Sequence, residues 1–139
     1  DFNFPTTVVA QNIVAGPGGG GPLNDEFTMP FLGLYEVSWC VHASSGPASL
    51  AVYVVSGTVA GDVAPASPNI VGPAIIASST VTNNSGVFPS QVIGHCFVRT
   101  LAANTTISIR NPGPAFNTVS GAARDRFVIR RIDFENGIF

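Results

Sequence analysis

Two short segments hold the side chains of this sequence that are best suited to chemistry. Cys40-Val41-His42 and His95-Cys96 contain every cysteine and histidine of the chain. A structural zinc site needs four such ligands around the metal. On an extended strand Cys40 and His42 share a face, whereas His95 and Cys96 point to opposite faces, so at most three reach one ion without a bulge. We therefore expect no metal and no other cofactor.

The two thiols leave two alternatives open. A disulfide between Cys40 and Cys96 would suit an exported protein, but it requires neighbouring strands with facing side chains. The other alternative is two unpaired thiols, with at least one of them in the core, where cysteine behaves as a small apolar residue. The sequence does not decide between them.

Other catalytic arrangements are not recognisable in the sequence. His42 and His95 lie in no motif that would supply a nucleophile and an orienting acid. The eight acidic residues are scattered along the chain, so a catalytic carboxylate pair cannot be singled out. The glycine run 16–21 lacks the Lys-Ser/Thr ending of a phosphate-binding loop. We predict no catalytic residue and do not expect an enzyme.

The segment Cys40-Val41-His42 lies at the end of residues 33–42, and this element must position its side chains. Apolar and polar residues alternate strictly along it, which predicts a strand with one face against a core. The same parity continues upstream through residues 27–31. The predicted core residues are Phe27, Met29, Phe31, Tyr35, Val37, Trp39 and Val41.

Further strands are expected between turns rich in Gly, Pro, Asn and Ser. The predicted strand regions are 50–55, with both faces buried, 70–82, interrupted at Gly72-Pro73, and then 91–101, 105–110 and 126–134. Sustained helical periodicity with capping signals is not seen. The chain is therefore predicted to be all-β, an antiparallel β-sandwich or jelly roll of about eight strands.

The N-terminal region divides from the rest at a Gly/Pro run. Residues 1–15 are a plausible strand or assembly arm, 16–22 a linker, and 23–139 the main domain. The linker is either a loop inside one domain or a tether that lets the first strand pair with a neighbouring subunit's sheet edge. The candidate assembly residues of the arm are Val8, Val9, Ile13 and Val14.

The charge of the chain is unusually low. Charged residues make up 10% of its 139 residues, against roughly 25% in an ordinary soluble domain, and every basic residue is Arg. A surface so poor in charge suggests that identical neighbours cover part of it. Nucleic acid is not an expected partner because an extended basic field is missing. Membrane insertion is not expected either.

Four of the six arginines cluster near the C-terminus, at Arg124, Arg126, Arg130 and Arg131. They are either the solvated ends of a buried strand or part of an inter-subunit surface. In the second case they would pair with Asp25, Glu26 or Glu36 of a neighbour.

Two motifs resemble a known family. Phe27 or Phe31 with Gly33 and Tyr35 is similar to the entry to the central strand of the tumour-necrosis-factor and complement-head jelly rolls. Residues 101–111 loosely resemble the motif before that family's last hairpin, with Ala103-Asn104 where Gly-Asp is usual. The likeness is to the bacterial branch, which includes the C-terminal domains of collagen-like exosporium glycoproteins on spore surfaces. It implies an extracellular, commonly homotrimeric, structural or binding module.

These observations favour a structural subunit that assembles with copies of itself, as a homotrimer or a filament, on a cell, spore or virion surface. Composition and an N-terminal Asp1 without Met fit a mature exported form. The alternatives are a lectin-like or receptor-binding tip, whose loops 56–69 and 111–123 would hold a glycan or receptor, and a virion capsid or decoration protein.

Overall fold

The computed structural model describes residues 14–16, 26–61, 63–65, 74–84, 86–87, 89–119 and 125–132. Within them it contains eleven strands and one short 3₁₀ turn, η2 (Ala77–Ser79). The strands are β1 (Val14–Gly16), β2 (Glu26–Met29), β3 (Gly33–Ala43), β4 (Ala48–Ser56), β5 (Val59–Ala60), β6 (Val63–Pro65), β7 (Ala74–Ile76), β8 (Val81–Asn83), β9 (Ser90–Thr100), β10 (Thr105–Arg110) and β11 (Arg126–Arg131).

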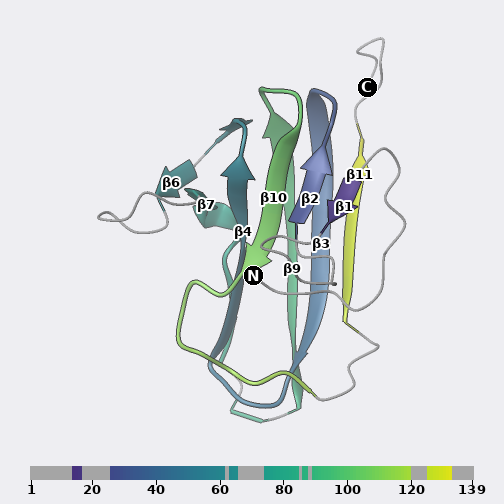
Figure 1. Ribbon diagram of the computed structural model, residues 1–139. Helices are drawn as coiled ribbons and strands as arrows, with labels where there is room; N and C mark the ends of the chain where they lie inside the picture. Colours follow the sequence, from purple (N-terminus) through teal and green to yellow (C-terminus); the bar gives the residue numbers. More distant parts are fainter. Residues whose placement is uncertain are drawn as a thin grey trace.

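The strands form two antiparallel sheets that pack face to face (Figure 1). The seven-stranded sheet has the order β1-β2-β10-β4-β7-β6, with β8 also paired to β4, and the four-stranded sheet has the order β11-β3-β9-β5. From β2 to β5, and again from β9 to β11, each successive strand lies in the other sheet. This arrangement confirms the all-β antiparallel sandwich.

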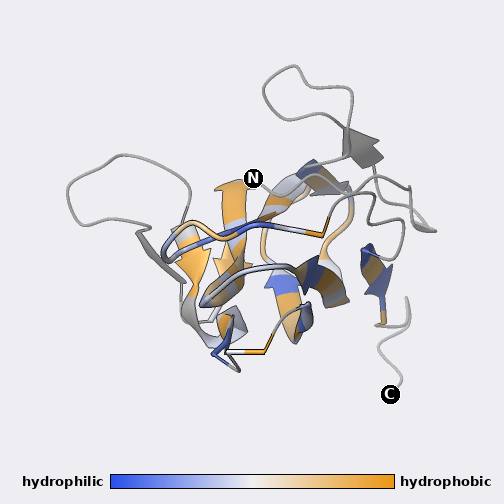
Figure 2. Ribbon diagram, turned by 90° about the horizontal axis from the view of Figure 1, so that it is seen from below, coloured by the Kyte–Doolittle hydropathy of each residue, from blue (hydrophilic) through white to orange (hydrophobic). Residues whose placement is uncertain are grey.

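The alternation predicted for the central strand is confirmed in β3. Tyr35, Val37 and Val41 are fully buried and Trp39 almost so, whereas the residues between them are mostly half-buried on the outer face. Phe27 and Met29 of β2 reach the same core, and the Phe27 ring stacks on Phe127 of β11 with centroids 4.1 Å apart. Hydrophobic and hydrophilic residues alternate along strands of both layers (Figure 2).

The prediction that Phe31 belongs to the core is wrong. β2 ends at Met29 and the chain bends at Phe31 and Leu32, so the alternation does not continue through the bend. The Phe31 carbonyl oxygen accepts hydrogen bonds from the Tyr35 hydroxyl at 2.8 Å and from Thr100 Oγ1 at 3.2 Å. These bonds fix the backbone of the bend, and half of the Phe31 side chain is left exposed.

The other strand predictions agree closely with the structure. β4 has both faces buried over residues 48–54, as its continuous apolar run indicates. β9 pairs with β3 over eleven consecutive positions, and β10 has the predicted bounds. In region 70–82 the structure places β7, η2 and β8, and the interruption predicted at Gly72-Pro73 lies outside the described residues. β11 ends at Arg131, and the prediction for 133–134 lies outside the described residues.

The part of the predicted N-terminal strand that the structure describes is β1, which pairs with β2 at one edge of the seven-stranded sheet. Val14 lies in β1, whereas Val8, Val9 and Ile13 and the linker beyond Gly16 lie outside the described residues. Among the described residues, the structure contains no helix that is long and apolar enough to cross a membrane.

Candidate functional site

The outer face of the four-stranded sheet carries a row of exposed apolar side chains. Alternate residues of β9 point into the core, and those between them point outward. Among the outward residues, Ile93 and Phe97 are 59% and 55% exposed, and Leu101, which follows the strand, is 56% exposed. The ring of His95, between Ile93 and Phe97, meets the Phe97 ring edge-on at 5.0 Å between centroids.

The registers of β3, β9 and β11 place other side chains beside this row. Phe97 is level with Glu36 of β3, and Glu36 in turn with Arg130 of β11. One row further along, His95 is level with Ser38, and Ser38 with Val128. We call Ile93, His95, Phe97, Glu36, Val128 and Arg130 the outer-face patch.

Glu36 is the acidic centre of the outer-face patch. Its carboxylate accepts a hydrogen bond from Arg130 Nε at 3.1 Å and lies 3.6 Å from Nε2 of His95. The hydrogen bond from Arg130 holds the pKa of Glu36 below its ordinary value; burial opposes this effect, and the charge of Arg130 and the contact with His95 lower the pKa further. Arg130, for which one alternative predicted an acidic partner on a neighbouring subunit, therefore pairs with Glu36 of its own chain.

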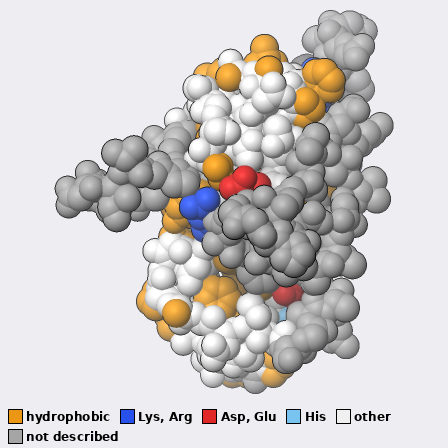
Figure 3. Space-filling view, viewed as in Figure 1, with side chains coloured by type: hydrophobic (Ala, Val, Ile, Leu, Met, Phe, Trp, Pro, Cys, Tyr) orange, Lys and Arg blue, Asp and Glu red, His pale blue; other side chains and the backbone are white. Residues whose placement is uncertain are grey.

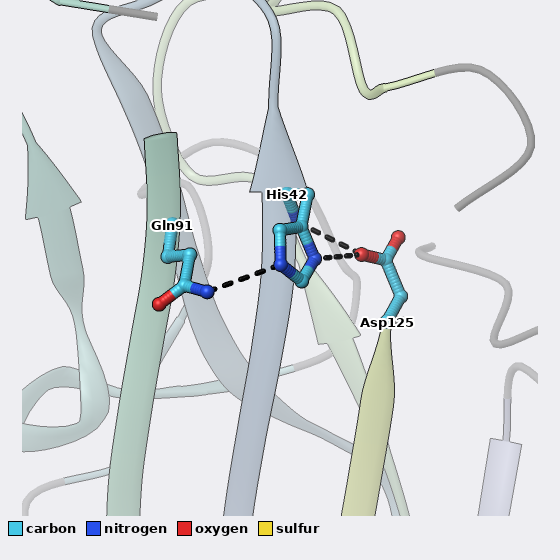
Figure 4. A network of polar contacts seen from close by, with 3 residues as sticks. All are labelled: His42, Gln91 and Asp125. Carbon is cyan, nitrogen blue, oxygen red and sulfur yellow. Dashed lines mark hydrogen bonds and ion pairs between the residues drawn. The ribbon is translucent and has the colours of Figure 1, made fainter. Parts of the chain in front are cut away.

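A second polar group joins three strands at one end of the same sheet (Figure 4). Oδ1 of Asp125, just before β11, accepts hydrogen bonds from the His42 backbone N at 2.8 Å and from His42 Nδ1 at 3.0 Å. The other ring nitrogen of His42 is 3.1 Å from Nε2 of Gln91 on β9. Asp125 is 3% exposed.

This group has the base and the orienting acid of a catalytic triad but not its nucleophile. Among the described residues, neither a hydroxyl nor a thiol is hydrogen-bonded to His42, whose second nitrogen is occupied by Gln91. Asp125 accepts hydrogen bonds from both the backbone amide and the ring of His42. The arrangement is that of a structural link between strand ends, in which the acid is buried.

The disulfide alternative for Cys40 and Cys96 is wrong: the two are not joined by a disulfide, and both are buried. Cys96 is level with Val37 and points into the core, whereas Cys40 is level with Ile93 and lies on the outer face. Three register positions, or about 10 Å, separate them along the strands, beyond the Cα separation that a disulfide spans. Burial raises the pKa of the Cys40 thiol, while nearby Arg126 opposes the rise.

The same parity separates the four residues considered for zinc. His95, Cys40 and His42 lie on the outer face of the sheet and Cys96 lies inside. His95 contacts Glu36, and His42 contacts Asp125. Within the described ranges, the structure brings together no group of three or more His, Cys, Asp or Glu that could hold a metal ion.

The remaining predicted assembly residues are only partly placed. Arg126 is exposed on β11 beside Cys40, and the Arg131 guanidinium lies 5.9 Å from the centroid of the Phe31 ring. Arg124 lies outside the described residues.

The sequence patterns did not single out the β9 row or Asp125. Apolar residues occupy both parities of β9, so the alternation does not say which set faces the core. Gly94 is the residue that could have shown which set of β9 residues faces the core. It is level with Trp39, where only a glycine leaves room for the indole. Asp125 is 83 residues from His42, and nothing local relates the two.

Comparison with protein-family models, with curated proteins and with solved structures gave no match. The resemblance to the tumour-necrosis-factor and complement-head family therefore stays a prediction.

Proposed function

We propose that this protein is an extracellular structural subunit that assembles with copies of itself through the outer-face patch. The observation that carries the proposal is that Ile93 and Phe97 on β9, and Leu101 just after the strand, are each more than half exposed. Single exposed apolar residues are common on proteins, but several on one sheet face favour an interaction surface.

The low charge of the chain supports the same proposal. Figure 3 shows the opposite sheet, and few charged atoms are visible among its described residues. A free monomer with so little charge has weak protection against association. Contact with an identical copy would cover apolar surface and would be consistent with the composition.

The charges within the outer-face patch suit a partner of the same kind. Glu36 lies between Arg130 and His95, so the patch contains both signs close to apolar side chains. A second copy, related to the first by a rotation, can place its Arg130 near Glu36 of the first copy. The exposed apolar side chains of the two copies can then pack against each other. Sheets that pack face to face in this way lie about 10 Å apart.

The N-terminal arm distinguishes a closed trimer from a filament. β1 is an edge strand and contributes three residues to its sheet. In the filament version, residues 5–15 of one subunit complete the sheet edge of the next, so that the pairing of β1 with its own β2 is exchanged between subunits. In the trimer version, the outer-face patch is sufficient by itself.

Removal of residues 1–20, followed by electron microscopy of full-length and shortened protein, separates the two versions. Closed particles that survive the truncation would support the trimer, whereas fibres that fall apart to monomers would support strand exchange. A full-length protein that is monomeric at micromolar concentration would contradict the proposed function in both versions.

A further inference from the structure

His95 is the side chain of the outer-face patch whose residue type changes charge near neutral pH. It lies on β9 between Ile93 and Phe97, and its side chain is 49% exposed. Because alternate residues of a strand share a face, these three side chains point outward together. Any partner that covers Ile93 and Phe97 therefore also covers the imidazole between them.

One carboxylate faces both basic side chains of the patch. Glu36 Oε2 lies 3.6 Å from His95 Nε2, and Glu36 Oε1 accepts a hydrogen bond from Arg130 Nε at 3.1 Å. Arginine is always protonated in proteins, so the charge of Arg130 already balances that of Glu36. With His95 neutral the patch has no net charge, and a proton on His95 leaves one positive charge unbalanced.

The other described acids are not placed to balance that charge. Asp125 accepts its hydrogen bonds from His42, which is level with Gln91, at the far end of β9 from Glu36. Glu26 belongs to β2 of the other sheet. Glu36 is therefore the acid that both His95 and Arg130 share.

The other charged groups on this face and the remaining elements packed against β9 add no negative charge within the described chain. Arg99 of β9 and Arg126 of β11 are exposed on the same face, and both are cations. The remaining elements packed against β9 are β4, β5, β8 and η2. Their one titratable side chain is Tyr53 of β4, which lies beside Arg110 on the other sheet.

Contact between identical copies would make protonation of His95 unfavourable to assembly. Each copy brings its own His95 to the shared surface, so each copy would add one positive charge there. A charge that loses water without gaining a partner is costly, and like charges across an interface repel each other. The apolar contacts of Ile93 and Phe97 are the same in both protonation states, so the charge on His95 determines the difference.

We propose that His95 is a pH-sensitive switch for assembly. Copies associate through the outer-face patch while His95 is neutral, and they separate when it gains a proton. Histidine gains its proton between about pH 8 and about pH 5.5, where carboxylates and arginine keep their charges. The switch rests on the proposed function, because it regulates the same surface.

Light scattering of the full chain at about pH 8 and about pH 5.5, at one protein concentration and one ionic strength, tests the switch. We expect a multiple of the mass of one chain at the higher pH and the mass of one chain at the lower pH. The far-ultraviolet circular dichroism should stay that of a β protein, and raising the pH again should restore the larger mass. A chain that unfolds at the lower pH, or a mass that is the same at both, would overturn the switch.

His95→Gln and His95→Arg provide a matched pair of variants. The first keeps position 95 neutral at both pH values and the second keeps it positive, and the position is on the outer face of the sheet, so both should fold. We expect His95→Gln to stay assembled at both pH values. At about pH 8, we expect His95→Arg to have a dissociation constant at least about tenfold above that of the wild type. Separation of His95→Gln at the lower pH would assign the response to another group and overturn the proposal.

His42→Gln is the control for the other histidine of the chain. His42 is half-buried and bonded to Asp125, so it is not expected to meet a partner through the patch. His42→Gln should therefore lose mass at the lower pH as the wild type does. A response that is lost in His42→Gln and kept in His95→Gln would contradict the switch. If His42→Gln does not fold, the two variants at position 95 still decide.

The switch and the proposed function can fail separately. An assembly with the same mass at both pH values would contradict the switch and support the proposed function. A wild type that has the mass of one chain at both pH values would contradict the proposed function, and the switch with it.

Discussion

Trp39 and Gly94 lie opposite each other across β3 and β9, and the indole of Trp39 occupies the space that any side chain at position 94 would need. A Cβ atom added to Gly94 would lie 2.0 Å from Cζ2 and 2.1 Å from Cε2 of that ring. The indole is buried between the two sheets, so it cannot move aside into solvent. This contact brings the widest core residue directly against the backbone of the strand that carries the exposed row.

Gly94→Ala is therefore expected to destabilise the protein by about 3 kcal/mol, the upper part of the range for overpacked cores. Urea unfolding followed by the fluorescence of the single Trp measures the loss. Gly113→Ala is the control, since its added Cβ would make ordinary contacts of 3.4 Å or more, and it should change stability by less than about 0.5 kcal/mol. Equal effects would contradict the Trp39–Gly94 contact.

The Glu36–Arg130 pair predicts a pKa that can be measured. Because Arg130 stabilises the charged carboxylate, the Glu36 pKa should be below its ordinary value in the native protein. Arg130→Gln should raise it, and Arg126→Gln, which removes a charge elsewhere on β11, should raise it less. The stabilisation that the pair contributes is present above the unfolded pKa of Glu and is lost as pH falls through the lower native value. Carboxyl-carbon NMR titration of Glu36 gives the result directly.

Burial raises the pKa of Tyr53, and the positive charge of Arg110 partly offsets the rise. Arg110→Gln should therefore raise the Tyr53 pKa further. Since the native pKa is above the unfolded one, Tyr53 contributes stability below about pH 10 that is lost as pH rises through the native value. Ultraviolet absorbance of tyrosinate measures the titration, and Tyr53→Phe identifies which of the two tyrosines gives the signal. A lower Tyr53 pKa in Arg110→Gln would contradict the position of the Arg110 guanidinium beside the Tyr53 ring.

The two thiols should be reduced and unreactive in the native protein. Cys40 and Cys96 are buried on opposite faces of one sheet, and burial raises the pKa of Cys40. Ellman's reagent should titrate almost no thiol in native protein and two per chain in urea. Finding none in urea without reductant would indicate a disulfide and contradict the register of β3 and β9.

Local alternation was sufficient to predict β3, because its polar and apolar residues separate cleanly by parity. The same rule placed Phe27 and Met29 correctly but failed at Phe31, where hydrogen bonds from Tyr35 and Thr100 fix a bend that parity does not describe. Periodicity describes a strand only as far as the strand extends.

The candidate surfaces were harder to predict because they depend on pairing between distant strands. The outward direction of Phe97 follows from its register with Glu36, and residues 111–119 are placed by their hydrogen bonds to the end of β3. Such contacts join residues dozens of positions apart, and a single sequence does not specify the register between its strands.

The central claim, assembly through the outer-face patch, is tested most directly by light scattering of full-length protein and two variants at micromolar concentration. Phe97→Glu places a charge in the patch, whereas Val87→Glu places one on an apolar residue that is 75% exposed in the turn before β9. Neither side chain is in the core, so both variants should fold. We expect the wild type and Val87→Glu to have a multiple of the mass of one chain, and Phe97→Glu to have the mass of one chain. A monomeric wild type, or an unchanged mass for Phe97→Glu, would contradict the account.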